Sequence, residues 1–101
     1  MNYLVFCIDN EGAQALRDEH LAGHLQHVEA VMDQLVLAGP CPGKDPGDPT
    51  QGSLLIFEAD SEDEALSLFK RDPYFSAGVW KSWDVRAFLP VAGQMVGGKT
   101  W

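Results

Sequence analysis

The order in which strand-like and helix-like patterns follow one another is the feature of this sequence that most restricts its fold. Residues 3–8 are uniformly apolar, β-branched or aromatic, which is typical of a strand covered on both faces. Further strands are predicted over 35–40, 52–60 and 82–91, and helices over 13–34 and 61–71. This order predicts an α+β, ferredoxin-like β-α-β-β-α-β fold, in which both helices cover one face of an antiparallel sheet.

The first predicted helix carries a long apolar stripe. Its members recur at spacings of four, three, four and three residues: Leu21, Leu25, Val28, Met32 and Leu35. We expect this stripe to face the core. Gly23 lies inside the helix at a cost of about 1 kcal/mol relative to alanine, so close packing is expected there. The second helix should begin at Ser61, because Glu64 three residues later completes a capping box.

One face of such a sheet remains uncovered in a chain of this size, so we expect a homodimer that packs sheet against sheet. The aromatic residues near the C-terminus should serve that packing or line an apolar pocket: Trp80, Trp83, Phe88 and Trp101. The Pro- and Gly-rich stretch over 41–52 is longer than most connections and is predicted to be a functional or flexible loop.

Composition indicates one globular domain over residues 1–101 with a net charge of −8. The basic residues are scattered, and only Lys70 and Arg71 are adjacent. Nucleic acids and anionic membranes are therefore not expected partners. The sequence shows no secretory signal pattern and no membrane span, and its only cysteines are Cys7 and Cys41. We expect a cytoplasmic protein with reduced thiols.

All three histidines lie in the stretch HLAGHLQH, at His20, His24 and His27. On a helix these spacings form one row along the edge of the apolar stripe. Three interpretations are open: an acid–base site, a metal site, or the polar edge of an amphipathic helix. The HExxH pattern of zinc sites is absent and one helix alone makes a weak site, so no metal is predicted. No cofactor motif is present either.

Short motifs follow one another along most of the chain: Arg17-x-x-His20-Leu21-Ala22, LVLAGP at 35–40, Gly52-Ser53, Asp72-Pro73-Tyr74 and Ala77-Gly78-Val79. In this order they resemble the YciI-like family, or YCII-related domain, from about residue 3 to 90. The resemblance implies a ferredoxin-like fold of the dimeric α+β barrel group. It also implies a cleft beside the first helix, with a histidine and an aspartate as an acid–base pair.

Carried over residue by residue, the family pattern places the histidine at His20 and the aspartate at Asp72. His24 is the alternative, since Leu25 follows it, but Leu21 would then stand where the pattern has arginine. We therefore predict His20 and Asp72 as catalytic residues that meet across the cleft. Arg17, Ser53 and Tyr74 are predicted to bind substrate.

Each of these residues also has a structural alternative. Arg17 could pair with a nearby carboxylate, Asp72 could end the second helix, and Asp9 is expected to cap the first. Cys7 is interpreted as a buried small residue and not a nucleophile. Two function classes stay open: a small cofactor-independent lyase or isomerase acting on a cyclic or aromatic-derived substrate, or a non-enzymatic module that binds a small ligand.

Overall fold

The centre of the molecule is a four-stranded antiparallel sheet in the order β2-β3-β1-β4. The computed structural model describes residues 1–100, so Trp101 lies outside the described residues. The strands are β1 (Asn2–Asp9), β2 (Leu35–Cys41), β3 (Gly52–Glu58) and β4 (Trp80–Phe88). In the register, Val5 lies between Leu55 and Val85, and Cys7 lies between Ser53 and Trp83. These alternate residues form the face of the sheet that the helices cover.

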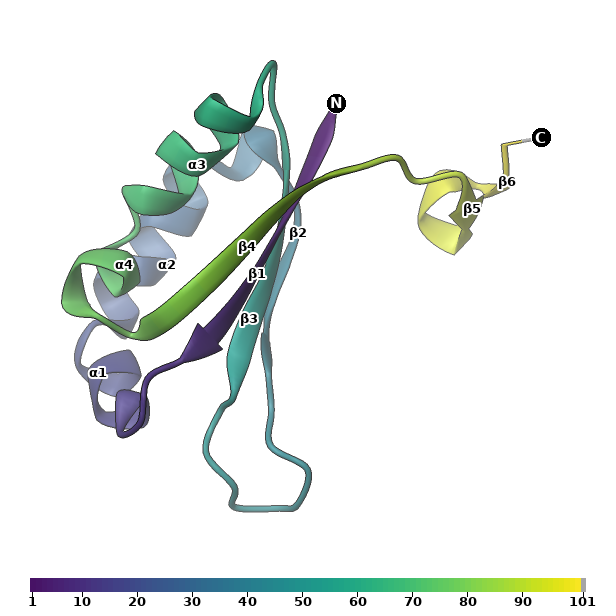
Figure 1. Ribbon diagram of the computed structural model, residues 1–101. Coiled ribbons are helices and arrows are strands. Elements are labelled where there is room, and N and C mark those ends of the chain that lie inside the picture. Colours follow the sequence, from purple (N-terminus) through teal and green to yellow (C-terminus); the bar gives the residue numbers. More distant parts are fainter. Residues whose placement is uncertain (101) are drawn as a thin grey trace.

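Four helices cover one face of this sheet, and the opposite face is bare (Figure 1). They are α1 (Ala13–Glu19), α2 (Leu21–Ala30), α3 (Glu62–Lys70) and α4 (Pro73–Ala77), with a 3₁₀ turn η1 (Met32–Gln34) before β2. As predicted, α3 begins after Ser61, whose side chain accepts a hydrogen bond from the Glu64 amide. The ferredoxin-like α+β fold is therefore confirmed.

The predicted helix over 13–34 is broken into α1, α2 and η1. The first break is at His20, whose backbone leaves the helical region at φ −102° and ψ 11°. The hydrogen-bond ladder still crosses it, because the His20 amide donates to Leu16 and the His24 amide donates to His20. The helical hydrogen bonds thus continue from α1 into α2 although the backbone bends at His20.

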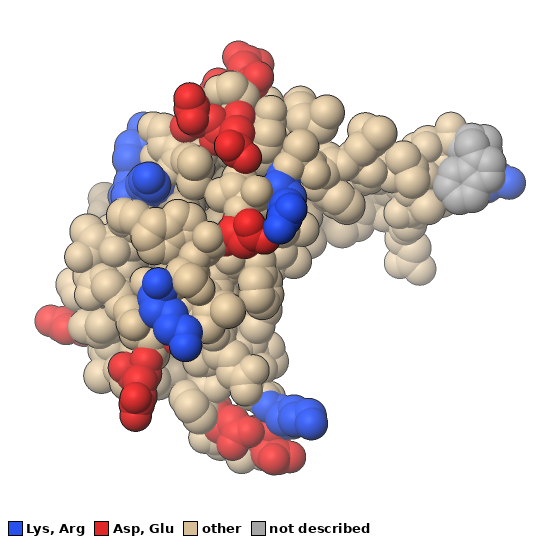
Figure 2. Space-filling view, in the orientation of Figure 1, with Lys and Arg blue, Asp and Glu red and all other residues tan. Residues whose placement is uncertain are grey.

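Two further segments differ from the sequence prediction. Residues 73–77, for which no element was predicted, form the short helix α4, because Asp72 caps its start and Pro73 occupies the first turn. After β4 the chain leaves the sheet as an arm that stands out from the body (Figures 1 and 2). The arm contains β5 (Ala92–Gly93), η2 (Gln94–Val96) and β6 (Gly98–Lys99), and β5 and β6 pair only with each other.

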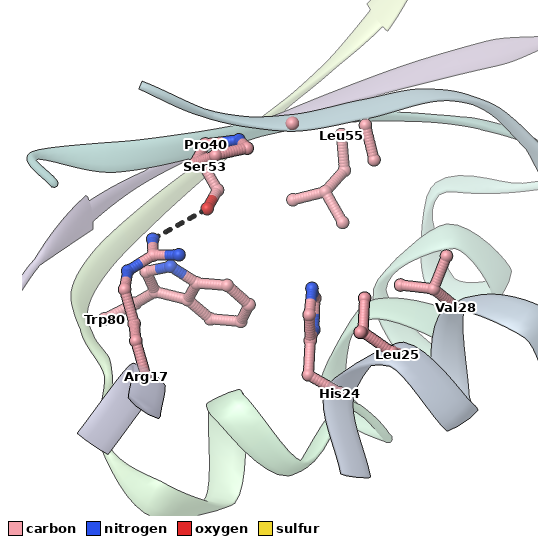
Figure 3. Close-up of a pocket in the computed structure, with 10 residues that line it drawn as sticks. Arg17, His24, Leu25, Val28, Pro40, Ser53, Leu55 and Trp80 are labelled. Carbon is pink, nitrogen blue, oxygen red and sulfur yellow. Dashed lines mark hydrogen bonds between the residues drawn. The ribbon is translucent and has the colours of Figure 1, made fainter. Parts of the chain in front are cut away.

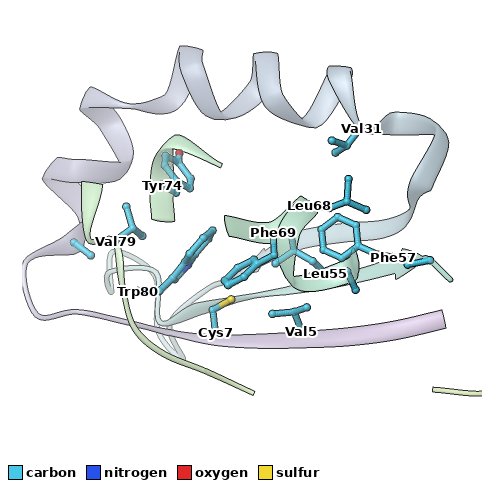
Figure 4. Packing of buried hydrophobic residues seen from close by; sticks show 13 residues of the cluster. Val5, Cys7, Val31, Leu55, Phe57, Leu68, Phe69, Tyr74, Val79 and Trp80 are labelled. Atoms are coloured by element: carbon cyan, nitrogen blue, oxygen red, sulfur yellow. The ribbon is translucent and has the colours of Figure 1, made fainter. Parts of the chain in front are cut away.

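The core lies between the sheet and the helices, where Val5, Leu55 and Phe57 meet Leu68 and Phe69 of α3 (Figure 4). Trp80, at the start of β4, stacks on Phe69 with the ring centroids 5.1 Å apart. Cys7 is fully buried in this cluster, and burial raises the pKa of its thiol to about 12. It therefore stays protonated, in agreement with the prediction that it is not a nucleophile.

The apolar stripe of α2 does not face this core, contrary to the prediction. Leu21, Leu25 and Met32 are 47%, 49% and 53% exposed, and no residue of α2 is buried. The reason is tertiary: α2 packs on α3 and α4 through its histidine flank. The His27 ring nitrogen Nε2 lies 2.9 Å from the Leu68 carbonyl oxygen of α3. His24 and His27 are thus turned inward, Leu21 and Met32 are turned outward, and Leu25 and Val28 lie at the edge, where they line a cavity described below.

Charged side chains are mixed over the visible surface. On the face in Figure 2, lysines and arginines stand apart and form no continuous basic surface, while acidic residues gather where α3 begins. Within residues 1–100, no helix is long and apolar enough to cross a membrane.

Candidate active site

His24 and Asp72 are joined by a short hydrogen bond. Nδ1 of His24 lies 2.7 Å from Oδ2 of Asp72, and the two side chains are 19% and 2% exposed. An ionised carboxylate can only accept, so against an ionised Asp72 the donor of this bond is Nδ1 of His24, and a neutral imidazole in that tautomer has its lone pair on Nε2. Figure 3 shows the free end of the His24 ring pointing into an open cavity.

The helix α4 holds Asp72 in position for this contact. Asp72 precedes Pro73 and has extended backbone angles, and its Oδ1 accepts the Tyr74 amide at 2.9 Å. The carboxylate therefore caps α4 with one oxygen and holds His24 with the other. The capping and orienting roles of Asp72, which were alternatives in the sequence, are thus combined in one carboxylate.

Gly23 explains why His24 is the histidine that reaches Asp72. A Cβ atom added at Gly23 would lie 3.3 Å from Cγ of Pro73, which is a tight contact, so the missing side chain favours the close approach of α2 and α4. The neighbouring residue His24 is thereby brought to the start of α4. The predicted close packing at Gly23 is confirmed.

The predicted contact between His20 and Asp72 is wrong. His20 stands at the corner between α1 and α2 with its side chain 37% exposed, and its Nε2 lies 3.8 Å from the Glu19 carboxylate. It does not line the cavity that His24 faces. His27 lies further along α2 and bonds to α3, so the three histidines point to three different surroundings.

Tyr74 supports His24 from behind and does not line the cavity, contrary to its predicted substrate contact. The two rings are stacked with their centroids 3.9 Å apart and an interplanar angle of 5°. The Tyr74 hydroxyl donates to the Arg17 carbonyl at 3.0 Å, and burial raises the pKa of the phenol. Tyr74 therefore fixes the plane of the imidazole and ties α4 to α1.

Arg17 forms a buried ion pair with Asp9, at the end of β1. Its Nε and Nη2 donate to the two carboxylate oxygens at 2.7 and 2.9 Å, and the side chains are 9% and 5% exposed. Burial opposes the charge on Arg17, but the hydrogen bonds and charge of Asp9 outweigh it, and the pKa of the guanidinium rises. The expected capping of α1 by Asp9 is wrong, since α1 begins after Gly12 without a side-chain cap.

The same guanidinium reaches the start of β3. Nη2 donates to the Ser53 hydroxyl at 2.9 Å and to the Gly52 carbonyl at 3.2 Å. A Cβ atom at Gly52 would lie 2.1 Å from the Cys7 carbonyl oxygen, so only glycine lets β3 approach β1 here. Arg17 and Ser53, which the sequence predicted separately as substrate-binding residues, thus lie together on the wall opposite His24.

A cavity of about 190 Å³ separates these two walls. Arg17, Ser53 and Trp80 stand on one side, and His24 stands on the other (Figure 3). Apolar side chains fill the rest of the lining: Leu25, Val28, Ala38, Pro40 and Leu55. The imidazole of His24, the polar side chains of the opposite wall and the apolar residues between them therefore surround the cavity. Its size and lining suit a small organic molecule.

The role of Asp9 in this site was not predicted from the sequence, where helix capping was expected, because its partner Arg17 comes from a different element. Trp80, one of the aromatic residues expected either to pack or to line an apolar pocket, lines this cavity. The signal for His24 was present, however. His24 directly follows Gly23, the one glycine inside a predicted helix, and it also precedes a leucine.

Comparisons with known proteins point to one family. The family model of the YCII-related domain matches residues 1–89. Protein YciI of Escherichia coli O6:H1 is 31% identical over 97 residues, covering 90% of this chain and 99% of that protein. An uncharacterized protein of Haemophilus influenzae is 32% identical over 99 residues, with coverage of 90% and 99%.

One solved structure is similar over nearly the whole chain. It is 5-chloro-2-hydroxyhydroquinone dehydrochlorinase (TftG) from Burkholderia phenoliruptrix AC1100, in complex with 2,5-dihydroxybenzoquinone. Its TM-score is 0.81 at 30% identity, and the match covers 93% of this chain and 97% of that one. The similar structure is thus that of an enzyme with a single-ring ligand.

Proposed function

Since the chain belongs to the family of the YCII-related domain, we propose that it is a small enzyme of the lyase or isomerase type, with His24 and Asp72 as its acid–base pair. The substrate is a small cyclic or aromatic-derived compound. The single observation that carries the proposal is the 2.7 Å contact between His24 and Asp72 at the wall of the cavity. The dehydrochlorinase with its quinone ligand supports the type of reaction and the substrate class.

The proposed chemistry is one proton transfer. Asp72 holds the Nδ1 proton of His24, which leaves the Nε2 lone pair free to take a proton from a ring carbon or hydroxyl. The electron pair of the broken bond forms a new double bond, which is C=C in the ring when a carbon loses the proton and C=O when a hydroxyl loses it. Either a leaving group departs with its own electron pair, or the proton returns at another atom. Both routes are redox-neutral and use only the side chains of the cavity.

The test is a turnover screen with two matched variants. The panel contains lactones and halogenated or hydroxylated single-ring compounds. With any substrate found, His24→Gln is expected to lower kcat by about 10²–10⁴-fold, because general acid–base catalysis contributes that much. His20→Gln lies on the same helical row and is expected to leave kcat within about threefold, since His20 faces away from the cavity.

The alternative function is a module that binds a small ligand without converting it. The same cavity would serve that role. If ligands bind but no compound of the panel is converted by the wild-type chain, or if His24→Gln and His20→Gln lose equal activity, the enzymatic proposal is wrong.

We also propose a homodimer formed by the bare face of the sheet. Its apolar residues Phe6, Ile8 and Phe88 are exposed, and the arm beyond β4 exposes Leu89 and Met95. Moving a fully exposed side chain of this kind out of water is worth about 1.5–3 kcal/mol, and these partly exposed residues would each gain a fraction of that value in a dimer. Light scattering is expected to give about twice the chain mass of 11.1 kDa.

Two substitutions on opposite faces test this interface. Phe6→Glu places a charge on the bare sheet face and is expected to yield the single-chain mass. Leu21→Glu alters an equally exposed residue of α2 and should leave the dimer intact. A wild-type chain that shows only the single-chain mass would contradict the proposal.

The other proposed partners and the location follow the sequence. We propose a small-molecule substrate as the partner, and no nucleic acid or membrane, in line with the net charge of −8. A cytoplasmic location is proposed as well, because Cys7 and Cys41 are both free thiols, as is usual in a reducing compartment.

A further inference from the structure

The bare face of the sheet carries an ion pair on β4. The register places Asp84 beside Phe6 and Arg86 beside Leu4 of β1, so both charges lie among apolar side chains. Nε of Arg86 donates to Oδ2 of Asp84 at 3.0 Å, and the Arg86 and Asp84 side chains are 72% and 62% exposed. In the single chain this pair is therefore open to solvent.

The rest of this face is apolar and almost uncharged. Its apolar members on β1, β3 and β4, which follow from the alternation of side chains along each strand, are Leu4, Phe6, Ile8, Leu54, Ile56 and Phe88. Among the described residues that pair with β1, Glu58 is the only further charged one, and it is bound to the N-terminal amine at 2.7 Å. The acidic excess of the chain, a net charge of −8, thus lies outside this face.

A second copy of the chain is the partner that this face fits. In a symmetric dimer the same patch meets itself, so each group on one copy must find its complement among the same groups on the other. Apolar side chains meet this condition with one another. Charges of a single sign would meet their own sign, whereas a neighbouring acid and base are complementary to their own rotated copy.

Burial in a dimer changes what the ion pair requires. Within residues 1–100 it makes one hydrogen bond, so Nη1 and Nη2 of Arg86 and Oδ1 of Asp84 are left to solvent. Once water is removed, a charged group without a partner is strongly destabilising. The adjacent side chains Phe6 and Leu4 offer no polar group. The groups that can complete these hydrogen bonds are therefore Asp84 and Arg86 of the second copy.

We infer that Arg86 of one copy pairs with Asp84 of the other across the sheet face, in two equivalent contacts. This inference rests on the homodimer proposed above and names the residues that select its partner. The apolar side chains supply the area that leaves water, and the crossed ion pairs set the orientation of the two sheets. They also distinguish a copy of this chain from other proteins that expose an apolar sheet.

Reversing one charge at a time tests the crossed pairs. In Asp84→Lys both positions of the pair are positive, and in Arg86→Glu both are negative. Each variant alone is expected to dimerise at least about tenfold more weakly than the wild-type chain, because like charges then meet at the interface. Sedimentation equilibrium of each full chain gives the dissociation constants, and circular dichroism shows that the exposed substitutions leave the fold intact.

An equal mixture of the two variants gives the decisive result. One copy of each places positive side chains opposite negative ones, so the mixture should form a heterodimer at least about tenfold more tightly than either variant dimerises alone. Native mass spectrometry identifies this heterodimer by its combined mass. An ion pair that acts only within one chain could not be repaired by mixing.

The same substitutions on the helical side of the molecule are the controls. Asp63→Lys changes an exposed residue of α3, and Arg71→Glu changes the exposed residue that follows this helix. Both variants should dimerise as tightly as the wild-type chain, because these positions lie on the layer opposite to the proposed interface.

Three results would overturn the inference. A wild-type chain with only the single-chain mass would leave the face to another partner, and the proposed homodimer would be wrong as well. A wild-type dimer that Asp84→Lys and Arg86→Glu leave unchanged would contradict the crossed pairs alone. So would two weakened variants that form no heterodimer when mixed. The role of His24 is decided separately by the turnover screen.

Discussion

Asp72→Asn is expected to lower turnover by about 10⁴-fold while the chain stays folded. The asparagine oxygen can still accept the Tyr74 amide and cap α4, as Oδ1 does at 2.9 Å. The amide nitrogen then faces Nδ1 of His24 and donates to it. His24 must therefore move its proton to Nε2, the nitrogen that faces the cavity. An imidazole with a protonated Nε2 cannot accept a proton from the substrate.

The tautomer can be measured without a substrate. ¹⁵N NMR of the His24 ring should show the proton on Nδ1 in the wild-type chain and on Nε2 in Asp72→Asn. Asp63→Asn changes an exposed carboxylate of α3 and serves as the matched control. Asp72→Ala removes the cap as well and should cost a further 0.5–2 kcal/mol or so of folding stability. An unchanged tautomer in Asp72→Asn, together with unchanged turnover, would contradict the assigned role of Asp72.

Arg17→Met is expected to lower the free energy of unfolding by about 3–5 kcal/mol. The substitution leaves Asp9, whose side chain is 5% exposed, as a buried carboxylate without a counter-charge. The cost arises mainly from that stranded charge, because the net contribution of a buried ion pair is small. It would be a large share of the total stability, which for a domain of this kind is about 5–15 kcal/mol.

The double variant Asp9→Asn/Arg17→Met tests this explanation. It removes both charges, so it should recover at least about 2 kcal/mol relative to Arg17→Met alone. Urea unfolding followed by circular dichroism gives the free energies. If the double variant is as unstable as the single one, the loss comes from packing around Arg17 and not from the Asp9 charge.

Local patterns determined the main elements of this protein. The apolar run over 3–8 and the capping box at Ser61 each act within a few residues of the chain, where sequence spacing is informative. Their order was sufficient for the ferredoxin-like fold, because few arrangements bury two helices on one small sheet. The family motifs also identified Arg17, Ser53 and Asp72 as residues of interest. Arg17 and Ser53 line one wall of the cavity, and Asp72 bonds to His24 on the opposite wall.

Only the tertiary structure decided which histidine reaches Asp72. His20 and His24 both precede a leucine on the same helical row, so spacing could not separate them. The choice depends on the corner at His20 and on the contact between Gly23 and Pro73, which lie 50 positions apart in the sequence. In this packing Leu21 is exposed and Leu25 and Val28 line the cavity, so the stripe residues of α2 lie outside the core, against their expected orientation. A periodic pattern defines the faces of a helix, but the elements packed against it determine which face is turned inward.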